Sequence, residues 1–155
     1  MTVRKIKIHD VDNLRSELDS LYEKQDPITL AKWSIEMANR IIEVSGLIKS
    51  DYPEIEQSFE VNKEWQLGQV RMHDVRQAGF IIHRIAREQK DEIKKNVFRT
   101  IGQAVGSGHM REHAMVTSDY AIKVINLMFI GDTDRVAEER HWQISRLLLL
   151  AKQND

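Results

Sequence analysis

The chain has 155 residues, with 23 lysines and arginines against 24 aspartates and glutamates, so a general electrostatic attraction for nucleic acid is excluded. It has no cysteine, which excludes disulfides, thiolate metal sites and a cysteine nucleophile. The longest apolar run, Leu147 to Ala151, is far shorter than the roughly 18 residues that span a bilayer, and the first residues lack the pattern of a secretory signal, so we expect a cytoplasmic protein with no membrane partner.

Helical periodicity dominates the chain, and only two prolines interrupt it. Residues 1–9 alternate weakly, so we expect either a disordered start or a short extended arm, with a short edge strand as another interpretation. Both prolines predict helix starts, because proline lacks the amide that is unpaired at the first helical position. In chain order, the predicted helices run from Asp10 as a cap through Tyr22, from Pro27 to Gly46, from Pro53 to Gly68, from Gln69 to about Gln89, from Asp91 to Val105, from His109 to about Ile130, and from Asp134 to Ala151.

The helices are joined by short connections, which favour antiparallel neighbours. No internal repeat or flexible linker divides the chain, so we expect one domain over residues 1–155. The predicted fold is all-α: a single-domain, compact bundle of about six or seven mostly antiparallel helices. The three tryptophans, Trp33, Trp65 and Trp142, are expected to anchor the core or its edge.

The segment from His109 to His113 comes closest to a chemical motif. Residues four apart share a face of a helix, so its two imidazoles would lie side by side. The segment also matches H-x-x-E-H, in which both histidines bind zinc and Glu112 is the general base. The match is five positions with two wildcards, so we favour hydrogen-bonded histidines at the edge of the core. A non-catalytic metal site with His83 as third ligand is the alternative.

A second group of polar residues lies on the predicted helix 69–89. Arg76 and His83 are seven apart, two turns along one face, with Gly79 between them. One interpretation is an anion or carboxylate contact in an open groove. The other is a buried arginine paired with an acid such as Asp119 or Glu112.

Two glycines, Gly102 and Gly106, are four apart and predict the close approach of two helices. Ser107 follows them. It lacks the spacing and the preceding strand of an exposed nucleophile, so a turn or a cap is predicted there.

Taken together, these positions resemble a bacterial family of small all-α proteins called putative immunity proteins, which are proposed to protect a cell against toxins delivered by its neighbours. The similarity covers the chain from about Leu30 onward. Gly106 and Gly108 depart from the family pattern, in which alanine and threonine are usual. The resemblance is carried by Leu30-Ala31-Lys32-Trp33; by Asp74-Val75-Arg76 with Phe80, His83 and Arg87; by Gly102-Gln103-Ala104-Val105, His109, His113-Ala114 and Tyr120-Ala121-x-Lys123; and by Glu138, Glu139, Arg140, Trp142 and Gln143.

The resemblance implies an all-α fold and a broad protective role, and it does not supply a mechanism. Our first interpretation is a non-enzymatic protein that binds and neutralises a cognate protein toxin by covering its active cleft. We expect no cofactor and no metal, and a homo-oligomer is left open. One alternative is that the same polar groups form a buried network that fixes the bundle. Another is a metal- or small-ligand-binding protein, with a hydrolase using His109 and His113 as its enzymatic form. The expected binding residues, gathered in one groove, are Arg76, His83, His109, His113, Tyr120 and Lys123.

Overall fold

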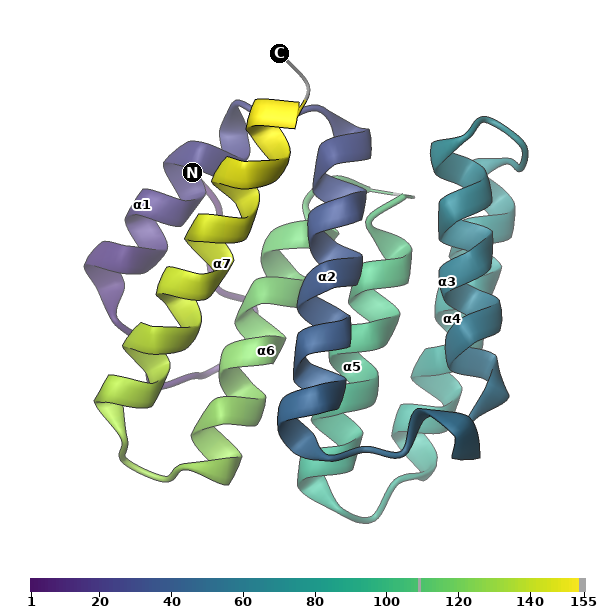
Figure 1. Cartoon of the computed structure of the whole chain (residues 1–155). Coiled ribbons are helices and arrows are strands. Elements are labelled where there is room, and N and C mark those ends of the chain that lie inside the picture. The colour runs from purple at the N-terminus through teal and green to yellow at the C-terminus, as the bar shows by residue number, and fades with distance from the viewer. Residues whose placement is uncertain (109, 154–155) are drawn as a thin grey trace.

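The computed structural model describes residues 1–108 and 110–153, and this part of the chain contains helices and no strand. The prediction of an all-α bundle of six or seven helices is confirmed. The elements are α1 (Asp12–Glu23), α2 (Pro27–Ser45), the short 3-10 helix η1 (Lys49–Asp51), α3 (Pro53–Gln66), α4 (Met72–Glu88), α5 (Glu92–Gly106), α6 (His113–Met128) and α7 (Thr133–Gln153). Figure 1 shows α2 in front of α5 and α6, with α7 and α1 on one side and the α3–α4 hairpin on the other.

Local chemistry sets several of the helix ends. Asp26 is the N-cap of α2, where its carboxylate accepts a hydrogen bond of 2.9 Å from the amide of Thr29, and Pro27 is the first helical residue. Gly46 and Gly68 follow α2 and α3 with φ angles of 74° and 73°, a conformation that costs other residues free energy. These starts and ends lie where the sequence predicts them.

Two groups of buried apolar side chains fill the bundle, one among α2 to α6 and one where α1 and α7 meet α2 and α6. Trp33 belongs to the second group and is fully buried, and its indole nitrogen donates a hydrogen bond of 3.0 Å to the carbonyl of Gln143. Trp65 and Trp142 are partly buried, and the guanidinium of Arg40 stacks on Trp142. The tryptophans therefore anchor the core and its edge, as predicted.

Residues 1–11 form an extended arm that lies against α1 and α6. The amide of Thr2 donates to the carboxylate of Asp19 at 2.8 Å, and the amide of His9 donates to the side chain of Asn126 at 2.8 Å. Because these bonds join the arm to two different helices, the arm is part of the folded structure.

The prediction of Asp10 as the cap of the first helix is wrong. Helix α1 begins at Asp12 after Val11, which makes no side-chain cap. The carboxylate of Asp10 instead accepts two hydrogen bonds from Arg140, at 2.9 and 2.8 Å, and one of 3.0 Å from Arg4. Two guanidinium groups are stronger partners for a buried carboxylate than a backbone amide, because both are charged.

A buried ion network lies behind this contact. It consists of Asp10, Arg15, Asp119 and Arg140, where Arg140 is fully buried and Asp119 is 2% exposed. The carboxylate of Asp119 accepts two hydrogen bonds from Arg15, at 2.9 and 3.0 Å, and one from Arg140 at 2.8 Å. The network thus joins the arm, α1, α6 and α7 through opposite charges.

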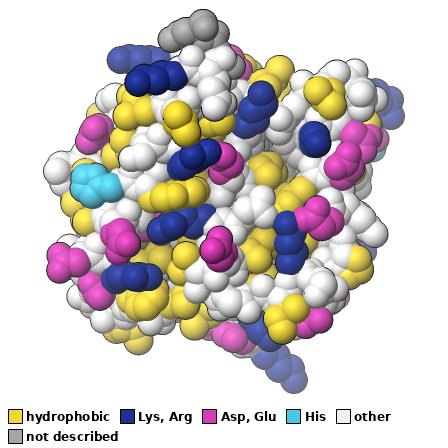
Figure 2. All heavy atoms as spheres, in the orientation of Figure 1, with side chains coloured by type: hydrophobic (Ala, Val, Ile, Leu, Met, Phe, Trp, Pro, Cys, Tyr) yellow, Lys and Arg dark blue, Asp and Glu magenta, His cyan; other side chains and the backbone are white. Residues whose placement is uncertain are grey.

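Ion pairs also link the outer surfaces of α2 and α7. Arg146 pairs with Glu36, and Arg40 pairs with Glu139 at 3.0 Å. On the face drawn in Figure 2, basic and acidic side chains alternate without a patch of one sign. Positive and negative side chains on this face therefore balance one another locally.

Candidate functional site

Helix α5 carries a stripe of glycines against which α4 and α6 pack. A Cβ atom at Gly79 of α4 would lie 3.4 Å from the carbonyl oxygen of Gly102, so the backbones of α4 and α5 are close together. A Cβ atom at Gly102 would lie 2.7 Å from two ring atoms of His83, and one at Gly106 would lie 2.6 Å from Nδ1 of His113. The close helix approach that the glycine spacing predicts is present, and the glycines also make room for two histidine rings.

The glycine stripe brings together histidines from different helices. His83 belongs to α4 and His113 is the first residue of α6. Their rings rest on glycines four apart in α5, and such positions are about 5–6 Å apart on one helix face. The structure places His83 beside His113. The sequence also predicts His109 as a neighbour of His113. His109 lies outside the described residues.

His83 is surrounded by positive charge. Its Nδ1 lies 2.9 Å from a terminal nitrogen of Arg99, and since a guanidinium can only donate, Nδ1 is the acceptor. Burial lowers the pKa of His83 most, and the charges of Arg99, His113 and Arg87 lower it further, to about 4. His83 is therefore neutral at pH 7, with its proton on Nε2. We refer to His83, Arg87, Arg99 and His113 as the histidine–arginine cluster.

The arginines of this region differ from the others in their partners. Within the described residues, each arginine outside α4 and α5 contacts a carboxylate or a backbone carbonyl; these are Arg4, Arg15, Arg40, Arg71, Arg111, Arg135, Arg140 and Arg146. The arginines within α4 and α5 have no carboxylate partner in that same part of the chain. They are Arg76, Arg84, Arg87 and Arg99. Within the described residues, the arginines without a carboxylate partner are thus confined to these two helices.

Arg76 is exposed on α4 and stacks on the ring of Phe80, 5.1 Å from its centroid. The alternative that Arg76 is buried and paired with Asp119 or Glu112 is wrong, because Arg15 and Arg140 bind Asp119 and Glu112 is exposed. Arg15 and Arg140, which bind Asp119, belong to α1 and α7, and the sequence does not identify these helices as neighbours of α6.

The other predicted residues on α6 are Tyr120 and Lys123, both half-buried. Tyr120 is seven residues from His113 and shares its helix face. Lys123 lines a hollow of about 410 Å³ together with residues 7–9 of the arm and Asn126 of α6. The contacts of the structure therefore gather His83 and His113, add Arg87 and Arg99, and leave Lys123 in a separate hollow.

Arg99 is the member of the cluster that the sequence does not single out. It lies three residues before Gly102, which places it on the glycine face of α5. That spacing is the signal that could have identified it.

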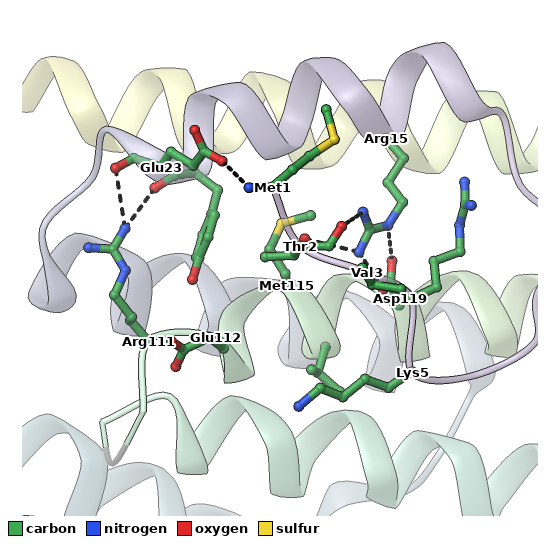
Figure 3. A pocket seen from close by; sticks show the side chains of 13 residues that line it. Met1, Thr2, Val3, Lys5, Arg15, Glu23, Arg111, Glu112, Met115 and Asp119 are labelled. Carbon is green, nitrogen blue, oxygen red and sulfur yellow. Dashed lines mark hydrogen bonds and ion pairs between the residues drawn. The ribbon is translucent and has the colours of Figure 1, made fainter.

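A cavity of about 530 Å³ lies between the arm, α1 and α6, and its lining includes none of the predicted binding residues that the structure describes. Figure 3 shows Met1 and Met115 at its centre, with Arg15 reaching Thr2 and Asp119. Arg111 donates to the carbonyls of Tyr22 and Glu23 at 3.2 and 3.4 Å. The guanidinium groups at its walls thus already have partners within the protein.

Metal binding is not favoured by the histidine–arginine cluster. Among the described residues, no three histidine, aspartate or glutamate side chains are placed to hold a metal ion. The positive charges of Arg87 and Arg99 beside His83 would also repel a divalent cation. None of the described helices combines the length and the apolar character needed to cross a membrane.

Comparison with known proteins yields one match. No curated protein and no solved structure shows significant similarity to the chain. The family of Imm-5 like putative immunity proteins matches residues 20–149, a range that contains α2 to α6 and the whole histidine–arginine cluster. Since this range is most of the chain, the protein belongs to the family of Imm-5 like putative immunity proteins.

Proposed function

We propose that the protein is an immunity protein that binds a cognate bacterial toxin and neutralises it by direct contact, without catalysis. Membership of the family supports the general role. The observation that carries the mode of binding is the concentration of arginines without carboxylate partners on α4 and α5. Such a surface is complementary to an acidic face of a partner protein.

The positive charge on α4 and α5 would favour rapid and specific association with an acidic partner protein. Complementary charge steers two proteins together, and buried arginine and aromatic side chains often slow their separation. Arg76 stacks on Phe80, and Phe80 is 46% exposed. This pair offers both a guanidinium and an aromatic ring to a partner.

The proposed interface extends from α4 over α5 to α6. Arg87 and Arg99 join it because they surround His83. Its other members are residues that the sequence suggests: Arg76, His83, His109, His113 and Tyr120. Lys123 lines the separate hollow near Asn126 and is not included.

Co-expression with a candidate toxin, sought among the neighbouring genes, tests this proposal. We expect the wild-type protein to restore growth of a host that produces the toxin, and to form a stable complex measurable by isothermal titration calorimetry. Arg76→Glu should weaken the complex by at least about tenfold, because it places an acid opposite the acids of the partner.

Arg135→Glu is the matched control, since Arg135 is also a partly exposed helical arginine stacked on a phenylalanine, but on α7. It should leave the affinity nearly unchanged. The proposal fails if the wild-type protein gives no protection, and the placement of the interface fails if both variants bind equally well.

A further inference from the structure

The surroundings of His83 are positive on every side from which charge reaches it. Arg87 contributes from its own helix, Arg99 from α5 and His113 from α6, and each of them opposes protonation of His83. Among the described residues, no carboxylate forms an ion pair with His83, Arg87 or Arg99. This arrangement leaves a local excess of positive charge that a bound anion would relieve.

Two members of this cluster, His83 and Arg99, are held in place. The ring of His83 lies against Gly102, where even a methyl group would be too close. Arg99 uses one N–H on Nδ1 of His83, which fixes the guanidinium and leaves four N–H groups in a rigid fork. A guanidinium with a fixed orientation loses little entropy when it binds a carboxylate through two parallel hydrogen bonds.

We propose that Arg87, Arg99 and His83 form a binding site for one carboxylate group, which an aspartate or glutamate side chain of the partner protein supplies. This inference rests on the proposed function and names the chemistry at one point of that interface. A partner rich in phosphate, such as nucleic acid, fits less well, because the whole chain has a formal net charge of −1. A metal ion fits less well because the cluster is already positive.

Anion binding to the protein without toxin can be followed by NMR of the histidine rings in the full chain. Sodium acetate is the probe for a carboxylate, inorganic phosphate is the second arm, and sodium chloride matches the ionic strength. We expect acetate to shift the ring signals of His83 saturably and to leave those of His73, which is exposed on α4, unchanged. The titration is run at pH 7, where His83 is neutral and its Nδ1 accepts the hydrogen bond from Arg99.

Two variants should remove the site. Arg99→Gln and Arg87→Gln should each weaken acetate binding by at least about tenfold, since each removes a charged donor. Arg87 is exposed, so its variant keeps the test valid if Arg99→Gln fails to fold. Arg84→Gln is the control, because Arg84 is an exposed arginine on α4 that does not act on His83. Arg99→Gln should also weaken the toxin complex by at least about tenfold.

The outcomes separate this inference from the proposed function. A lack of saturable acetate binding, or equal binding by Arg99→Gln, overturns the carboxylate site even where the wild-type protein protects against the toxin. Saturable binding of phosphate without acetate overturns the choice of carboxylate. A functional acetate site in a protein that gives no protection rejects the proposed function instead.

Discussion

Replacement of Arg140 by methionine should destabilise the protein strongly. The side chain is fully buried and donates five hydrogen bonds: two to Asp10 at 2.9 and 2.8 Å, and one each to Asp119, Gln143 and Ser118. Methionine preserves much of the volume but leaves two buried carboxylates with one guanidinium fewer. Breaking a buried ion pair on one side typically costs about 3–5 kcal/mol.

The pKa of Asp10 gives an independent magnitude. Burial raises it, but hydrogen bonds and charge from Arg140, with help from the amide of Val11 and from Arg4, lower it more, from 3.8 to about 2. At 1.36 kcal/mol for each pH unit, this difference corresponds to about 2 kcal/mol in favour of the folded protein. Because Arg4 remains in the variant, we expect the lower part of the range, about 3 kcal/mol.

Urea unfolding at pH 7 measures this cost, with Arg146→Met as the matched control. Arg146 also pairs with a glutamate, but its side chain is 33% exposed, so its loss should cost less than about 1 kcal/mol. Since the folded pKa of Asp10 is depressed, its stabilisation is complete above pH 3.8 and is lost as the pH falls toward 2. That acid-induced loss should be smaller in Arg140→Met. Equal unfolding free energies for the two variants would refute the importance of the buried ion network.

Three further changes have definite outcomes. Gly102→Ala should destabilise the fold by about 1–3 kcal/mol in urea unfolding, because the new methyl group displaces His83 from Arg99. This cost exceeds the gain from the better helix propensity of alanine. A stabilised variant would contradict the glycine packing. Burial lowers the pKa of His83 from 6.5 to about 4, so in that pH window the unfolded chain binds a proton at His83 that the folded chain does not. The free energy of unfolding should therefore decrease as the pH falls from 6.5 to about 4, and His83→Gln should reduce this decrease. An unchanged pH dependence in the variant would show that the ring is exposed in solution. Trp33→Phe should cost about 1–3 kcal/mol by thermal unfolding, since the carbonyl of Gln143 loses its donor; an unchanged melting temperature would argue against that bond.

Helix positions could be predicted from the sequence because their signals are local. A proline after a capping aspartate at Asp26, and a glycine at Gly46 or Gly68, act on the residues next to them. The burial of Trp33 could likewise be predicted from its size and its apolar neighbours. Such features need no knowledge of which helices are neighbours.

The site could be predicted only in part, because its contacts join distant residues. From the sequence alone Asp10 is predicted as a helix cap, because its partner Arg140 is 130 positions away and is brought beside it only by the fold. His83 and His113 are thirty residues apart, and only the packing of α4 and α6 on the glycines of α5 makes them neighbours. The alternative that pairs Arg76 with Asp119 is wrong for the same reason, because the arginines that bind Asp119 come from distant helices.

The bond between Asp10 and Arg140 has a consequence for how the chain is made. A ribosome that adds about 5–20 residues per second releases these two side chains roughly ten seconds apart. During that interval the middle helices can associate, while the N-terminal arm and α1 wait for α7 to emerge. The bond between Asp10 and Arg140 is therefore among the last contacts of the newborn polypeptide to form, and truncation before Arg140 should make the arm more accessible to proteases.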